Sequence, residues 1–267
     1  MKGTRGRKTR HAPQKVIDTA KGLASIFIFL VLWEALPRTG IIDPAFLPPA
    51  SRVVAAWLDL VGSGELFEHF FVSLQRAATG FVLALLIVIP LGIAIGWYKG
   101  FAKFIDPLIQ TFRQTSALAL FPVFILFLGI GELSKTAMVF WATQWPILLG
   151  TIGGVKYVDP LLIKFARSMG VKDVRLFSQV ILPAAMPSIL TGIRLGASYS
   201  ILILVAAEMI GAKAGLGFMI INSQYNFEIP KMYAAILTIA LFGLSVNYFL
   251  VWLERVIMAW KEEVIQL

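Results

Sequence analysis

Few residues in this chain have the types and spacing needed for catalysis or nucleotide binding. Residues 129–136, GIGELSKT, approach a phosphate-binding loop, but Ser134 stands where that loop requires a glycine. Residues 215–220 lack the last glycine of a dinucleotide-binding fingerprint. The two histidines, His11 and His69, have no further metal ligands at a suitable spacing, and the chain has no cysteine. The sequence therefore predicts no catalytic residue, no metal site and no cofactor on this chain.

Carboxylates near the ends of apolar segments are the remaining candidates for chemistry, because ionisable groups inside a membrane are costly and are usually functional. Glu34 and Glu208 each lie near one end of such a segment. Glu208 comes just before a glycine-rich turn, residues 211–217. Its carboxylate could pair with Lys213 or Arg76, or face a water-filled cavity. The sequence leaves both interpretations open.

Other polar residues interrupt the apolar segments and could line a path for a solute. The candidates for such a path are Arg113, Gln114, Ser198, Glu208 and Asn247. The alternative is structural: residues 113–116 could satisfy a helix N-terminus, and Ser198 and Asn247 could bond to a neighbouring helix.

The composition indicates which elements must position these residues. The chain is 58% hydrophobic and 15% charged, with a mean hydropathy of +0.80, whereas soluble domains are roughly 45–50% apolar. A membrane-spanning helix needs about 20 mainly apolar residues. The windows that meet or approach this length are residues 77–98, 114–131, 136–155, 189–207 and 232–253. With the shorter segment 22–36, they predict an all-α integral membrane protein with about six transmembrane helices.

The basic residues predict the orientation. Cytoplasmic loops keep an excess of Lys and Arg, and most of the 24 Lys and Arg residues lie on one side if the N-terminus is cytoplasmic. The C-terminus is then cytoplasmic as well. The net charge of +9 is explained by this bias and by contact with anionic membrane lipid, so no nucleic-acid partner is expected.

Residues 159–183 form a polar stretch between apolar segments, and the orientation places this stretch in the cytoplasm. Pro160 can begin a short helix, Gly170 can end it, and Asp173 can cap a second helix. We therefore expect a cytoplasmic helical hairpin that a partner protein can bind.

This hairpin resembles the cytoplasmic loop of bacterial ABC-importer permeases, with its pattern EAA, three residues, Gly, nine residues, I-x-L-P. The residues at matching positions are Ala166, Gly170, Val180, Leu182 and Pro183. Lys164 replaces the glutamate and Phe165 replaces the first alanine. Further segments after about residue 73, such as FPVFILFLGIGELSK and VAAEMIGAKAGLGFMI, resemble the branch that transports nitrate, sulfonate, taurine and bicarbonate.

The resemblance implies a type I ABC importer permease fold in a bacterial inner membrane. It also implies three kinds of partner: a second copy of this chain, two cytoplasmic ATPases that bind ATP and Mg, and an extracytoplasmic solute-binding protein. The implied ATPase-coupling residues are Lys164, Ala166, Gly170, Val180, Leu182 and Pro183. A sulfonate, nitrate, taurine or similar solute is expected. The alternatives are an importer for a neutral vitamin precursor, an ATP-independent carrier or channel, and a membrane enzyme.

The expected organisation has four parts. Residues 1–21 form a basic cytoplasmic tail, and residues 22–72 hold the first span and an outer segment. Residues 73–257 form the permease domain, and residues 258–267 form a cytoplasmic tail. Within the outer segment Ser51 is expected to cap a short helix over residues 51–60. No internal repeat is visible, so a path between two like halves would require a homodimer.

Overall fold

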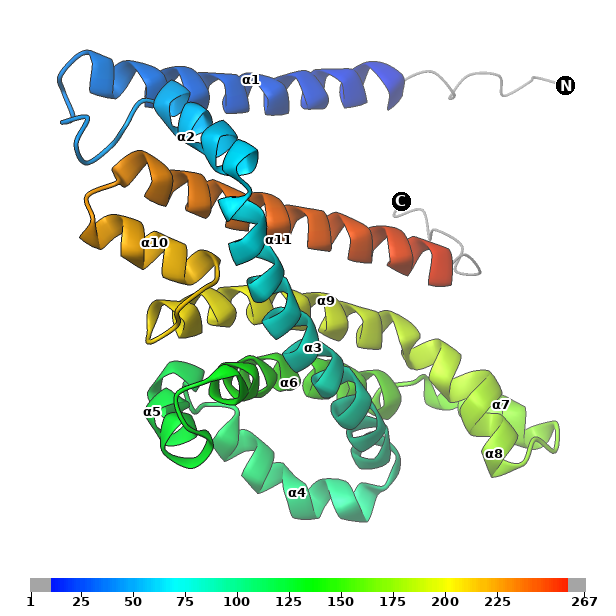
Figure 1. The fold of residues 1–267 in the computed structure, drawn as a ribbon. Helices are drawn as coiled ribbons and strands as arrows, with labels where there is room; N and C mark the ends of the chain where they lie inside the picture. Colours follow the sequence, from blue (N-terminus) through cyan, green and yellow to red (C-terminus); the bar gives the residue numbers. More distant parts are fainter. Residues whose placement is uncertain (1–10, 259–267) are drawn as a thin grey trace, which may run out of the picture.

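The structure is a computed structural model that describes the backbone of residues 11–258 and the side chains from residue 21 onward. The described residues form α-helices, one short π-helical stretch and no strand. Figure 1 shows most of the long helices running in roughly one direction, with one long helix crossing them obliquely. The helices are α1 (His11–Arg38), α2 (Ala50–Ser63), α3 (Glu65–Trp97), α4 (Lys99–Phe112), α5 (Ala117–Leu128), α6 (Glu132–Lys156), α7 (Pro160–Ser168), α8 (Asp173–Leu176), η1 (Phe177–Ile181), α9 (Leu182–Met209), α10 (Leu216–Tyr225) and α11 (Ile229–Ile257).

Four helical segments are long and apolar enough to span a membrane: α3, α6, the continuous segment Asp173–Met209, and α11. A fifth candidate is the pair α4 and α5, which is bent by 96°. Of the predicted window 114–131, α5 covers only Ala117–Leu128, and it passes the length and hydropathy test only together with α4, from which a bend separates it. The expected sixth span corresponds to α1, whose side chains are described only in part.

Helix α6 lies at the centre of the bundle and packs most extensively against α9 and α3. Small residues permit the backbones of these helices to approach one another closely. A Cβ atom at Gly92 of α3 would lie 2.8 Å from Cβ of Thr151, and one at Gly192 of α9 would lie 2.7 Å from the carbonyl oxygen of Pro146. Small residues let helix backbones approach within lipid. These small-residue faces therefore pack helices of this chain against one another.

Helices α1 and α2 meet through a cap that comes from a distant residue. Ser51 lies inside the first turn of α2, and Pro49 occupies the N-cap position. The Glu34 carboxylate of α1 accepts hydrogen bonds from the Ser51 backbone N–H at 2.9 Å and from its hydroxyl at 2.8 Å. The prediction that Ser51 caps this helix is thus wrong, because a glutamate from α1 satisfies the helix N-terminus instead.

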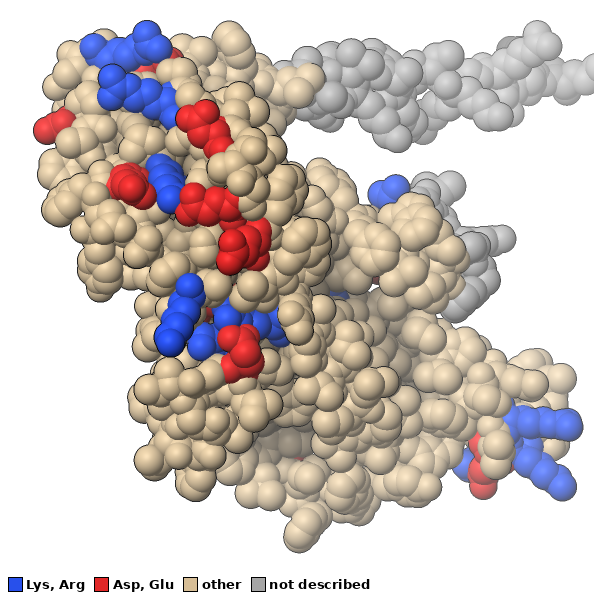
Figure 2. All heavy atoms as spheres, viewed as in Figure 1, with Lys and Arg blue, Asp and Glu red and all other residues tan. Residues whose placement is uncertain are grey.

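Charged side chains on the visible face gather at two ends of the molecule, with an uncharged band between them (Figure 2). One group runs down the left side of the view, from α1, α2 and the start of α3 to the turn between α9 and α10, and the other lies over the hairpin formed by α7 and α8. Many large apolar side chains are exposed in the band, including Leu86 at 66% and Leu202 at 67%. An uncharged, apolar band between two charged ends is typical of a membrane-spanning bundle. The hairpin and the first turns of α3 lie at opposite ends of this bundle.

Candidate coupling and translocation sites

The hairpin, residues 159–183, forms as two helices joined by a tight turn. The Asp159 carboxylate accepts a hydrogen bond from the Leu161 N–H at 2.8 Å and caps α7. Gly170 has a φ of 77°, which a glycine adopts without steric cost. Asp173 is the first residue of α8 and not its cap, because Lys172 occupies the N-cap position. Its carboxylate lies 3.6 Å from the Arg167 guanidinium instead.

The second helix of the hairpin continues into the membrane without a break. α8, η1 and α9 form one helical segment of 37 residues, Asp173–Met209, or about 55 Å at the usual rise. Leu176 and Ile181 at the junction are fully buried. The hairpin is therefore joined by a continuous helix to the far end of the bundle.

One face of the hairpin packs on the bundle and the other is exposed. Ala166 is buried in a cluster with Val155 and Ile181, so a small residue is needed there. On the outer side Leu161, Phe165, Met169 and Val174 are between 65% and 82% exposed, and Lys164 is exposed beside them. We call these four side chains the apolar hairpin face. Exposed apolar patches outside the membrane are typical of protein-binding surfaces.

The break between α4 and α5, residues 113–116, carries two of the path candidates. Arg113 and Gln114 are both exposed there. They line a cavity of about 550 Å³ together with Trp141, Trp145 and Tyr199. Non-helical backbone at membrane depth is tolerated only where it is buried in protein or lines a water-filled cavity. An exposed arginine within a broken span likewise requires water or a polar partner.

The same cavity has aromatic walls with unused hydrogen-bond donors. Trp141 and Trp145 pack edge to face with ring centroids 5.4 Å apart. Among the described residues, neither indole N–H has a hydrogen-bond partner. Buried indole N–H groups usually find a partner. The cavity thus combines a cation, amide and hydroxyl groups and aromatic rings, which suits a small polar organic solute.

The remaining path candidates on α9 and α11 lie apart from this cavity. Ser198 is exposed on α9, where its hydroxyl donates to the Arg194 carbonyl at 3.3 Å. Asn247 is exposed on α11. Arg194 forms an ion pair with Glu254 of α11 at 3.2 Å, which links the two helices. Ser198 and Asn247 do not line the cavity at the break.

Glu208 lies in a buried network at the opposite end of the bundle from the hairpin. Its carboxylate is fully buried and accepts hydrogen bonds from the Ser73 hydroxyl at 2.8 Å, Arg76 Nη1 at 2.8 Å and the Gly217 N–H at 2.9 Å. Of the two pairings considered from sequence, the one with Arg76 is present. Arg76 also donates to Glu132 at the start of α6. We call Ser73, Arg76, Glu132 and Glu208 the outer clasp, since they join α3, α6 and α9.

The glycine-rich turn is shaped around this carboxylate. Gly215 has a φ of 122°, and a Cβ atom there would collide with the Glu208 carboxylate. The Gly215 N–H donates to Nδ1 of His69 at 3.0 Å. His69 lies in α3, so this hydrogen bond joins the turn to α3. Sequence reasoning missed Ser73 and Glu132, which carry no motif that could have revealed them.

Comparison with known proteins places this bundle in a family. The family described as "Binding-protein-dependent transport system inner membrane component" matches residues 88–258, which include the hairpin and the break. The chain belongs to this family. The matched region leaves out α1, α2 and both outer clasp residues on α3, Ser73 and Arg76.

Alignments with known relatives of this permease extend over nearly its whole length. It is 34% identical to an aliphatic sulfonates transport permease protein of Bacillus subtilis, over 90% of this chain and 87% of the relative. It is 33% identical to the taurine transport system permease protein of Escherichia coli, over 91% and 90%. It is 30% identical to the bicarbonate transport system permease protein of Synechococcus elongatus, over 91% and 90%. The predicted branch is confirmed.

A solved structure confirms the fold of the permease. A chain from an inward-facing form of the MetNI methionine ABC transporter matches with a TM-score of 0.61 at 14% identity. The match covers 70% of this chain and 93% of that one. The permease therefore has the type I ABC importer fold that the sequence predicted.

Proposed function

We propose that this permease forms, as a homodimer, the membrane path of an ABC importer for a small organic anion of the sulfonate class. A separate solute-binding protein delivers the solute, and two cytoplasmic ATPases drive transport. The apolar hairpin face carries this proposal, because it offers a partner an exposed surface at the end of a continuous transmembrane helix. The names of the sulfonate and taurine relatives support the solute class.

The proposed mechanism uses the helix Asp173–Met209 as a lever. Closure of the ATPases around ATP moves the hairpins, and each hairpin displaces α9 together with α6, against which it packs. Lys164, Ala166, Gly170, Val180, Leu182 and Pro183 are the proposed coupling residues. Ala166 holds the hairpin on the bundle, and Gly170 permits its turn. The bundle rocks as a rigid body between inward-open and outward-open states.

The proposed path runs past the break. Arg113 and Gln114 would contact the solute in the cavity there. Ser198 and Asn247 would face the path or the second copy, because exposed polar groups in a span avoid lipid. Glu208 would hold the outer end of the path closed through the outer clasp. This chain makes and breaks no covalent bond; ATP and Mg are bound by the ATPase.

Transport by reconstituted protein tests this proposal. With the ATPase inside proteoliposomes and the binding protein outside, we expect uptake of a radiolabelled alkanesulfonate only when ATP, ATPase and binding protein are all present. The matched control omits the ATPase alone. Uptake that is equally fast without the ATPase would show an ATP-independent carrier or channel. A neutral heterocycle that competes better than the sulfonate would overturn the proposed solute class.

A further inference from the structure

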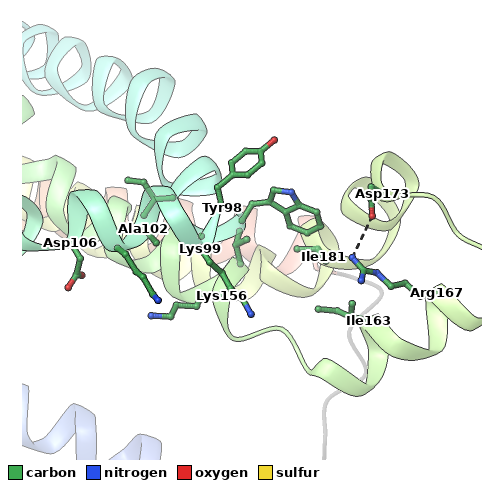
Figure 3. A pocket seen from close by; sticks show the side chains of 14 residues that line it. Tyr98, Lys99, Ala102, Asp106, Lys156, Ile163, Arg167, Asp173 and Ile181 are labelled. Atoms are coloured by element: carbon green, nitrogen blue, oxygen red, sulfur yellow. Dashed lines mark ion pairs between the residues drawn. The ribbon is translucent and has the colours of Figure 1, made fainter.

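A second cavity lies at the hairpin end of the bundle, between α4 and the hairpin. Its volume is about 920 Å³, larger than that of the cavity at the break. The end of α3, the start of α4, the last turn of α6 and the inner side of the hairpin line it (Figure 3). None of the proposed coupling or path residues lines this cavity. Its chemistry is therefore separate from the proposed function.

The cavity has an excess of positive charge. Lys99, Lys103, Lys156 and Arg167 line it. In Figure 3 the labelled Lys99 and Lys156 side chains extend toward the same side of the cavity, and Arg167 reaches in from the hairpin. Among the described residues, no carboxylate forms an ion pair with any of the three lysines; Lys156 instead lies 5.6 Å from the ring centre of Tyr157.

Two carboxylates also line the cavity, and both have other partners. Asp173 lies 3.6 Å from Arg167. Asp106 accepts a hydrogen bond from the side chain of Gln110, one turn further along α4, at 3.3 Å. The three lysines therefore remain available to an external anion.

The depth of the cavity points to lipid. Trp97 and Tyr98 line it at the end of α3, and Tyr98 is 62% exposed. Tryptophan and tyrosine at helix ends are typical of the headgroup level of a bilayer. Apolar side chains such as Ile95, Ala102 and Ile181 form the rest of the wall. A phosphate group bound by the lysines would thus carry its glycerol and acyl chains along an apolar surface.

We propose that this cavity binds the headgroup of an anionic phospholipid, with Lys99, Lys103 and Lys156 contacting the phosphodiester. The hairpin forms the opposite wall through Ile163 and Arg167, so the bound lipid contacts both the hairpin and the bundle. Basic pockets between helices on the cytoplasmic side of a membrane are typical sites for such headgroups.

Lipid binding to the full-length chain in detergent tests this inference. The probes are phosphatidylglycerol and phosphatidylcholine with identical acyl chains, and binding is followed by native mass spectrometry. We expect wild type to prefer phosphatidylglycerol, and a Lys99→Gln, Lys156→Gln variant to bind it about thirtyfold more weakly. The matched control is Lys21→Gln, Arg255→Gln, which removes two exposed charges outside the cavity and should leave the preference in place.

Three results would overturn the inference: no preference for phosphatidylglycerol, equal weakening in both variants, or displacement of the lipid by millimolar inorganic phosphate, which would indicate a soluble anion as the occupant. Lysine acetylation of the wild-type chain in nanodiscs gives a test that does not depend on folding of a variant. Phosphatidylglycerol should protect Lys99 and Lys156 but not Lys21. Equal labelling of Lys99 and Lys156 in both lipids would count against the site.

Discussion

Replacing Glu208 with alanine should lower the free energy of unfolding by about 3–5 kcal/mol, because the change leaves the buried Arg76 guanidinium without its fully buried partner. The Ser73 hydroxyl and the Gly217 N–H lose their acceptor in the same step. The measurement is equilibrium unfolding in mixed SDS and dodecylmaltoside micelles.

Glu132→Ala is the matched control for Glu208→Ala. Glu132 contacts the same arginine, but its side chain is 66% exposed, so its removal should cost no more than about 1 kcal/mol. An Arg76→Met, Glu208→Leu double variant should lose less unfolding free energy than the sum of the losses in the Arg76→Met and Glu208→Leu single variants. In the double variant neither buried partner is left charged and unpaired. Equal losses for Glu208→Ala and Glu132→Ala would contradict the prediction that the buried carboxylate is the main anchor of the outer clasp.

Gly150→Ala should lower the free energy of unfolding by about 2–3 kcal/mol, because the added methyl group would collide with backbone atoms. A Cβ atom at Gly150 of α6 would lie 2.9 Å from the Gly192 Cα and 3.0 Å from the Ser188 carbonyl oxygen of α9. Backbone atoms cannot rotate away, so α6 and α9 must separate. The same unfolding assay measures the loss.

Gly153→Ala, one turn further along α6, is the control for Gly150→Ala. A Cβ atom at Gly153 meets nothing within 4 Å. The change should therefore stabilise the helix by up to about 1 kcal/mol through alanine's better helix propensity. If both alanine variants were equally stable, the close approach of α6 and α9 at Gly150 would not be required for folding.

Apolar windows alone were enough to locate α3, α6, α9 and α11, because each is long and strongly hydrophobic. The break between α4 and α5 escaped detection for a physical reason. α5 has only 12 residues, and the polar residues before it have the same composition as the entry of a straight span. The 96° bend that pairs α5 with α4 is a property of the folded backbone, and the composition of the segment does not carry it.

The hairpin was predictable because Pro160 and Gly170 act on the backbone locally, where a helix begins and where it ends. Its capping was predicted less well, since Asp159 caps the first helix and Asp173 pairs with Arg167. Long-range partners explain the other misses. Ser73 and Glu132 bind residues more than 50 positions away, and one sequence contains no signal for such pairs. The role of Lys164 stays a prediction.

Docking of the ATPase on the apolar hairpin face is the central claim, and co-purification of the ATPase with the permease tests it most directly. Phe165 on this face is 65% exposed, and Phe46, at the α1 end of the molecule, is 75% exposed. Phe165→Glu should abolish co-purification of the co-expressed ATPase without changing the unfolding midpoint, because a charge enters an apolar contact. Phe46→Glu should retain the ATPase. Full recovery of the ATPase with Phe165→Glu would contradict the account.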